Sequence, residues 1–162
     1  MRRVLVLGCP GAGKSTLARS LGEALSLPVV HLDKLWWKSG WVNRTEGEFD
    51  ALLDAVLLGE EWVIDGNYLR TLPRRLERCD AVVLLDYPRR VCLFRALRRI
   101  LSWRGRTRPD MAADCPERLD GEFVRWIWEF HHPAAPGAGA AGRLDGGKAR
   151  VPLPQRLCAL PG

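Results

Sequence analysis

Four short apolar runs alternate along the chain with segments that repeat their apolar positions every three or four residues. The runs are Val4–Leu7, Val29–Leu32, Trp62–Ile64 and Ala81–Leu85. Short continuous apolar runs rich in β-branched residues indicate buried strands. Strands that alternate with helices indicate crossover connections and a parallel sheet covered on both faces. The pattern therefore predicts a three-layer α/β/α fold.

The predicted helices follow these strands. Leu17, Leu21 and Leu25 are spaced four apart and predict a helix from Ser15 onward. A capping-box pattern at Thr45 and Glu48 predicts the start of the next helix. Further helices are expected from Pro73 to about Arg78, from Pro88 to about Trp103, and over an amphipathic stretch that carries Leu119 and Phe130.

The chain changes character after residue 130. Residues 133–142 are Pro, Ala and Gly alone, and Pro152 and Pro154 interrupt an apolar run at Val151. Because proline lacks the backbone N–H that a strand ladder needs, we expect this tail to be poorly ordered or irregular. The chain is therefore divided into a domain at 1–130 and an atypical Ala/Gly/Pro-rich tail at 131–162.

The bulk composition narrows the class of protein. A chain of 162 residues is long enough for one core. It has no apolar run near the roughly 20 residues of a membrane span. Its five cysteines are scattered without a Cys-x-x-Cys pair, which argues against a disulfide framework or a zinc site. We therefore expect a cytoplasmic protein that does not enter a membrane.

The segment from Gly8 to Ser15 carries the strongest chemical signal. It reads Gly-Cys-Pro-Gly-Ala-Gly-Lys-Ser, the complete G-x-x-x-x-G-K-[ST] pattern between a predicted strand and helix. Its glycines let backbone N–H groups turn toward phosphates, at a helix N-terminus that favours negative charge. Lys14 supplies a charge for the β- and γ-phosphates, and the Ser15 hydroxyl is a Mg²⁺ ligand. The pattern predicts ATP and Mg²⁺ as ligands. The ATP-binding residues expected here are Gly8, Pro10, Gly11, Ala12, Gly13, Lys14, Ser15 and Thr16.

Three carboxylates stand at the ends of predicted strands. Asp65 is expected to hold Mg²⁺ directly or through water, and Asp86 competes for that role. Asp33 is expected to end the second strand, where it could act as general base for an acceptor hydroxyl or orient it. A turn carboxylate is the alternative for each. The absence of an Asn-Lys-x-Asp sequence argues against a GTPase.

The positive charge of the chain gathers between Arg70 and Arg108. Guanidinium groups bind phosphate oxygens bidentately, so this stretch is expected to receive substrate phosphates. A solvated basic face and a nucleic-acid surface are the alternatives.

The residues after the P-loop resemble those of adenylate-kinase-like P-loop kinases. The similar pieces are Asp65-Gly66 followed by Arg70, and Asp86-Tyr87-Pro88 followed by a helix with two arginines four apart. The resemblance implies that Arg95 stacks on adenine and that Arg99 closes on the phosphates. It implies the same closing role for arginines of a short lid at about residues 104–117, namely Arg104, Arg106 and Arg108.

A closer resemblance is to the bacterial topology modulation proteins and related P-loop kinases. The matching segments are His31–Trp41, Trp62–Tyr68, Arg104–Asp110, Cys115–Glu117 and Arg125–Phe130. The resemblance spans residues 1–130 and is lost in the tail.

The segment from Leu32 to Trp41 lies where related kinases hold the phosphate acceptor. Its three tryptophans are expected to form an aromatic wall for a planar or sugar-like acceptor, with core packing as the alternative. The predicted acceptor-binding residues are Asp33, Trp37, Asn67 and Arg70; the predicted catalytic residues are Lys14, Asp33 and Arg99; the predicted metal ligands are Ser15 and Asp65.

Together these features predict an ATP-dependent kinase for an unidentified small-molecule or nucleotide acceptor. A nucleic-acid-associated ATPase and a nucleotide-binding protein without turnover are the alternatives. The arginines cluster around the predicted lid, which favours the kinase.

Overall fold

The computed structural model of the chain describes residues 1–117, 121–129, 143–144 and 148–150. The helices are α1 (Lys14–Leu25), α2 (Leu32–Trp36), α3 (Glu46–Leu57), α4 (Leu72–Arg78), α5 (Arg89–Ser102) and α6 (Gly121–Glu129), with 3₁₀ turns at Ser39–Trp41 and Leu69–Thr71. The strands are β1 (Arg3–Gly8), β2 (Val29–His31), β3 (Trp37–Lys38), β4 (Val42–Asn43), β5 (Trp62–Asp65), β6 (Ala81–Leu85), β7 (Arg143–Leu144) and β8 (Lys148–Arg150).

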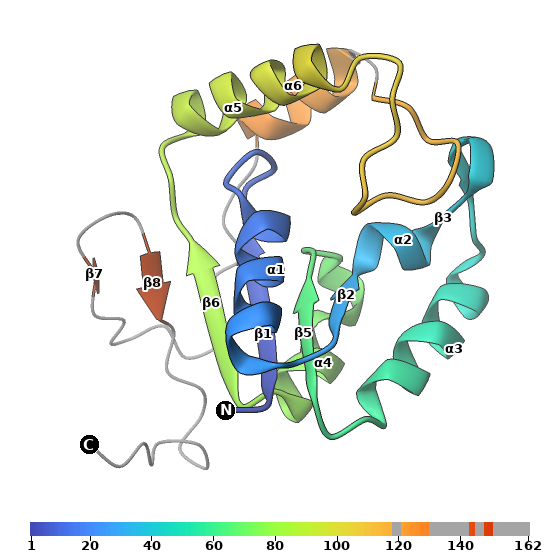
Figure 1. Cartoon of the computed structure of the whole chain (residues 1–162), viewed down its shortest axis with the longest axis vertical. Helices are drawn as coiled ribbons and strands as arrows, with labels where there is room; N and C mark the ends of the chain where they lie inside the picture. The colour runs from blue at the N-terminus through green and yellow to red at the C-terminus, as the bar shows by residue number, and fades with distance from the viewer. Residues whose placement is uncertain (118–120, 130–142, 145–147, 151–162) are drawn as a thin grey trace.

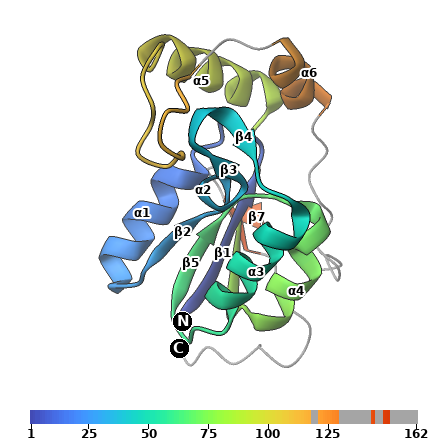
Figure 2. The same ribbon diagram turned by 90° about the vertical axis from the view of Figure 1, so that its right-hand side faces the viewer.

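The main sheet has the strand order β2-β5-β1-β6-β8-β7, and its first four strands are parallel. Helix α1 covers one face of these strands, and α3 and α4 cover the other (Figure 2). Helices α5 and α6 lie beyond the ends of the strands (Figure 1). The predicted α/β fold with a parallel sheet is confirmed.

The core follows from the burial of the central strands on both faces. Val4 and Val6 pack on one side with Ala18 of α1, whereas Leu5 packs on the other side with Phe49 of α3. Successive residues of β1 therefore point to opposite faces of the sheet, as the two-residue period of a strand requires. The predicted capping box forms at the start of α3, where Thr45 Oγ1 accepts from the backbone N–H of Glu48 at 3.2 Å.

One expectation from the sequence is wrong. The second strand ends at His31, and Asp33 lies in the first turn of α2 instead of at a strand end. Leu32, at the start of α2, is fully buried beneath the glycine that follows β5. In the tail, strand β8 pairs antiparallel with β6, whose edge otherwise offers unpaired backbone groups. Apart from β7 and β8, the tail lies outside the described residues, so its expected irregularity stays a prediction.

Two further expectations concern residues that the structure does not describe. Helix α6 is described from Gly121 to Glu129, so Leu119 and Phe130 of the predicted last helix lie outside the described residues. The division of the chain at residue 130 falls there too and stays a prediction. None of the described helices has the length and apolar character needed to cross a bilayer.

Candidate active site

The P-loop needs glycine at two positions for different reasons. Gly11 has a φ of 83°, and a Cβ there would lie 2.2 Å from the carbonyl oxygen of Cys92 on α5. Gly13 has a φ of 94° and precedes α1, yet a Cβ there would meet nothing within 4 Å. The first glycine allows close packing, and the second leaves open space at the helix N-terminus. Such a space, lined by backbone N–H groups, suits an anion.

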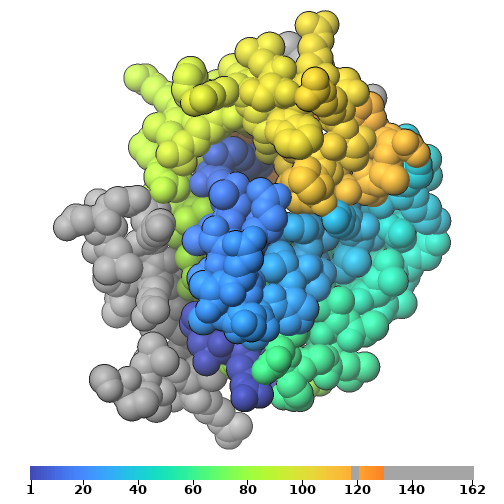
Figure 3. All heavy atoms as spheres, viewed as in Figure 1, coloured from blue at the N-terminus to red at the C-terminus, as the bar shows by residue number. Residues whose placement is uncertain are grey.

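A cavity of about 910 Å³ opens over this loop. Figure 3 shows the P-loop, in blue, recessed beneath the yellow residues of α5 and the following loop. The predicted site residues that line the cavity are Pro10, Gly11, Gly13, Lys14, Ser15, Thr16, Asp33, Trp37, Asp65, Asn67, Arg95, Arg99 and Arg108. Five predicted site residues do not line it, namely Gly8, Ala12, Arg70, Arg104 and Arg106.

Four of these five residues lie elsewhere in the molecule, and Gly8 is described below with Asn67. Ala12 is buried and donates its N–H to the Cys9 carbonyl at 3.0 Å within the loop. Arg70 points to α3, where its guanidinium donates to both carboxylate oxygens of Asp50 at 2.9 and 2.7 Å. The prediction that Arg70 lines the crevice is therefore not met. Arg104 and Arg106 are exposed on the outside of the predicted lid.

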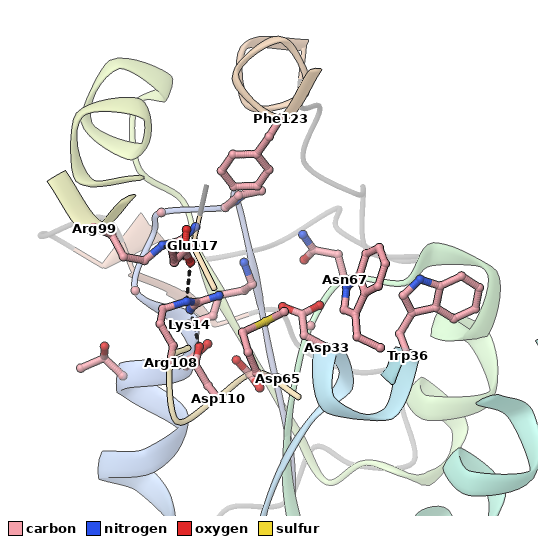
Figure 4. A pocket seen from close by; sticks show the side chains of 18 of the residues that line it. Lys14, Asp33, Trp36, Asp65, Asn67, Arg99, Arg108, Asp110, Glu117 and Phe123 are labelled. Carbon is pink, nitrogen blue, oxygen red and sulfur yellow. Dashed lines mark hydrogen bonds and ion pairs between the residues drawn. The ribbon is translucent and has the colours of Figure 1, made fainter. Parts of the chain in front are cut away.

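Lys14 lies in the cavity among other charged side chains. Its Nζ donates to the Cys9 carbonyl at 3.2 Å, so the ammonium is held over the loop. Burial lowers the pKa of Lys14, and the charges of Asp33 and Asp65 oppose that effect. Figure 4 shows Lys14 beside Arg99 and Arg108, with the two aspartates between it and the acceptor-side residues. A half-buried cation near two carboxylates is suited to receive phosphate oxygens.

Asp65 forms a hydrogen bond with a side chain that the sequence did not indicate as its partner. His31 Nδ1 lies 2.5 Å from Asp65 Oδ1, and both side chains are buried. The second carboxylate oxygen of Asp65 and the Ser15 hydroxyl oxygen can serve as metal ligands in the cavity wall. Within the described residues no three His, Cys, Asp or Glu side chains gather as a metal site. Because Mg²⁺ keeps waters and phosphate oxygens and needs few protein ligands, this donor set fits Mg²⁺.

Asp33 is held by a hydrogen bond from the neighbouring wall. The Tyr68 hydroxyl donates to Asp33 Oδ1 at 2.9 Å. Burial raises the pKa of Asp33, with repulsion from Asp65 adding to it and Tyr68 and Lys14 opposing it. One carboxylate oxygen is thus fixed, and the group is poised to take up a proton more readily than an exposed aspartate.

Asn67 and Arg75 hold the segment that follows β5. The Asn67 side chain accepts from the Gly8 N–H at 3.2 Å and donates to the Gly8 carbonyl at 2.9 Å. Arg75 is fully buried and donates to the carbonyls of Gly66, Asn67 and Tyr68. Asn67 therefore ties this segment to the P-loop, although its side chain was predicted to bind the acceptor.

The lid contributes a charged network above the P-loop. The Nε atoms of Arg99 and Arg108 lie 3.2 and 2.5 Å from the same Glu117 oxygen, without hydrogen-bond geometry. Arg108 also donates to Asp110 at 2.6 Å (Figure 4). The pKa of Asp110 is lowered overall. Burial raises it, but the charge of Arg108 and a hydrogen bond from Ser15 together outweigh burial. Burial and the charge of Arg108 lower the pKa of Arg99.

The far end of the lid rests on the segment that carries the tryptophans. Ser39 donates to Asp114 at 2.7 Å, and Trp41 donates its indole N–H to the Pro116 carbonyl at 3.2 Å. The buried Cys115 thiol accepts from the Trp41 backbone N–H at 3.3 Å. The lid and the predicted acceptor segment are therefore joined, so movement of one displaces the other.

Sequence reasoning missed His31, Arg75, Asp110 and Glu117. Asp110 and Glu117 lie in segments that match the family resemblance, and a carboxylate among lid arginines could have been read as their counter-ion. His31 and Arg75 gave no signal, because their partners are distant in sequence or are backbone carbonyls.

Sequence comparison places the chain among known kinases. It is 34% identical over 143 residues to a shikimate kinase of Corynebacterium efficiens, covering 80% of this chain and 79% of that protein. It is 27% identical over 128 residues to a putative adenylate kinase of Pyrococcus abyssi, covering 75% of this chain and 63% of the relative. No protein-family model matches the chain.

A solved structure agrees on the fold. A gluconokinase from Sinorhizobium meliloti superposes with a TM-score of 0.51 at 19% identity, over 79% of this chain and 73% of that one. The strand, P-loop and helix beneath this cavity define a P-loop nucleotide-binding protein. The chain belongs to the P-loop kinase family that includes shikimate kinase and adenylate kinase. It is a nucleotide or small-molecule kinase of that family.

Proposed function

We propose that the chain transfers the γ-phosphoryl group of ATP, bound with Mg²⁺, to a hydroxyl group of a small acceptor. The observation that carries this proposal is one cavity lined by Lys14, by the carboxylate of Asp33, by Arg99 of α5 and by Arg108 of the lid. Phosphoryl transfer depends on positioning and on neutralising phosphate charge, and these groups supply both.

The donor side of the cavity is the P-loop with α5 and the lid. Backbone N–H groups at the start of α1 would face the β-phosphate, and Lys14 would release the Cys9 carbonyl to bind β- and γ-oxygens. Ser15 and Asp65 would hold Mg²⁺, which when bound neutralises charge on the β- and γ-phosphates. Arg95 already stacks 4.5 Å from the centre of the Tyr87 ring, a position that supports its predicted contact with adenine.

Asp33 is the proposed base. The acceptor oxygen would bond to the γ-phosphorus as the bond from that phosphorus to the β-γ bridging oxygen breaks. The hydroxyl proton would pass to the Asp33 oxygen that Tyr68 does not hold, and ADP would leave. Arg99 and Arg108 would exchange Glu117 for the transferring phosphoryl group, because a phosphate carries more negative charge than a carboxylate.

Within the family, we propose closeness to the topology modulation proteins, on the strength of the segments from His31 to Trp41 and from Arg104 to Asp110. The nucleic-acid alternative loses support, because Arg70 and Arg74 are paired with acids of α3 and do not form a free basic face. The arginines at the cavity are better placed for a nucleotide.

The test is Lys14→Ala, with Lys34→Ala as control. Lys34 lies exposed on α2 outside the cavity. Lys14→Ala should lower acceptor-dependent ADP release by at least about 10²-fold, the loss typical of one charge-stabilising donor. Lys34→Ala should keep it, and circular dichroism should show both variants folded. Wild-type turnover in folded Lys14→Ala would contradict the proposal.

A further inference from the structure

The acceptor end of the cavity has an unusual distribution of charge. This end is lined by Asp33, Trp36, Trp37, Trp41, Tyr68 and Leu69. It offers aromatic faces and one carboxylate. The cationic side chains of the lining are Lys14, Arg19, Arg95, Arg99 and Arg108, and all belong to α1, α5 or the lid.

The cations in and near the acceptor segment do not face the cavity. Lys34 is exposed on α2 and does not line it. Arg44 donates from one guanidinium nitrogen to the carbonyls of Lys34, Leu35 and Trp37 at 3.0 to 3.3 Å.

Arg70 is paired bidentately with Asp50, Lys38 donates to Glu48 at 2.8 Å, and Arg75 is buried against three carbonyls. Among the described residues, none of these five cations lines the cavity. An anionic group at this end would therefore be desolvated with none of them beside it, which is costly.

Asp33 already has polar partners. Tyr68 donates to one of its oxygens at 2.9 Å. Burial raises the pKa of Asp33, and the Tyr68 hydrogen bond, Lys14 and Arg108 oppose that effect. A neutral hydroxyl can use the remaining oxygen without adding an unpaired charge. Trp37 and Trp41 meet edge to face with centroids 5.1 Å apart, which gives a ring or sugar face an apolar contact.

From this arrangement we infer that the acceptor is an uncharged, hydroxyl-bearing molecule with a planar or apolar face. The inference rests on the proposed kinase activity and names its substrate class. It separates this chain from the relatives, since shikimate and gluconate are carboxylates and the acceptor of an adenylate kinase is a nucleoside monophosphate.

The experiment compares acceptors that differ only in charge. The pairs are adenosine with AMP, D-glucose with D-gluconate, and methyl shikimate with shikimate. Binding is followed by quenching of tryptophan fluorescence, and turnover by ADP release with Mg²⁺ and ATP. One of the three pairs will bind most tightly. In that pair we expect the neutral compound to bind at least about tenfold more tightly than its anionic partner, because the anion lacks a counter-ion. An equal or tighter anion, or a panel in which no neutral compound binds, would overturn the inference.

A designed cation tests the cause. Leu69 lines the rim of the cavity and is 58% exposed, whereas Leu58 is 74% exposed and lies on the outside of the molecule beyond α3. Leu69→Arg should raise the affinity for the anionic member relative to its neutral partner, and Leu58→Arg should not. An unchanged ratio in Leu69→Arg would also overturn the inference.

The two proposals fail differently. If neutral compounds bind but stimulate no ADP release, the kinase proposal fails while the charge preference stands. If anionic compounds are bound in preference and phosphorylated, the kinase proposal stands and the inference fails.

Discussion

Arg75 offers a sharp test of how this site is held. Its buried guanidinium donates to the carbonyls of Gly66, Asn67 and Tyr68, with distances of 2.9 Å to the first and third. Burial lowers the pKa of Arg75 to about 10, so the group stays protonated at neutral pH. Arg75→Met keeps much of the apolar stem and removes this donor. The Tyr68 carbonyl still accepts from the Thr71 N–H at 3.0 Å and from its hydroxyl at 3.1 Å, so the carbonyls of Gly66 and Asn67 are the ones left without a donor.

The magnitude follows from these contacts. A buried carbonyl without a donor costs about 1 kcal/mol or more, so two cost at least about 2 kcal/mol. At about 2–4 °C per kcal/mol for a chain of this size, the Tm of Arg75→Met should fall by at least about 4–8 °C.

Arg74→Met is the matched control on the same helix. Arg74 pairs with Asp54 at 2.9 Å and with Asp50 at 3.0 Å, but its side chain is 40% exposed. Exposed pairs contribute about 0–1 kcal/mol, so this variant should unfold almost as the parent does.

Urea titration followed by circular dichroism compares the two variants, with a lower midpoint and an unchanged slope expected for Arg75→Met. Acceptor-dependent turnover below the Tm should fall in Arg75→Met as well, because Arg75 holds the segment of Asn67 and Tyr68. If both variants unfold at the same midpoint, the carbonyls of Gly66 and Asn67 do not depend on Arg75 and the reasoning is refuted.

Three further predictions concern the reaction. Asp33→Asn should lower acceptor-dependent turnover by about 10²–10⁴ with little change in ATP affinity, and a matching loss of ATP binding would place Asp33 on the nucleotide side. Tyr68→Phe removes a hydrogen bond that lowers the pKa of Asp33, so that pKa should rise beyond the increase due to burial. Since the base must be deprotonated, the acid limb of the kcat/KM profile should move to higher pH, and an unmoved limb would exclude Asp33 as the base. ATP with Mg²⁺ should protect residues 104–117 from trypsin, and cleavage at the same rate with and without it would argue against lid closure.

Local patterns in the sequence determined the parts of this protein that depend on neighbouring residues. The P-loop follows from eight consecutive residues, and the start of α3 follows from Thr45 and Glu48. The four parallel strands are continuous apolar runs because both faces of the sheet are covered. Since parallel strands place their carboxyl ends at one edge, the sequence also brought Asp65 to the P-loop.

Only the tertiary structure decided which charged groups are free to act. The sequence between Arg70 and Arg108 shows arginines but not their partners, which lie on other elements. Packing of α4 against the segment after β5 buries Arg75, and packing near α3 turns Arg70 away from the cavity. Asp33 lines the cavity from the first turn of α2, because β2 ends at His31 and does not continue to Asp33. A side chain's charge is fixed by its residue type, but its role depends on the counter-ion and the solvent that the fold leaves beside it.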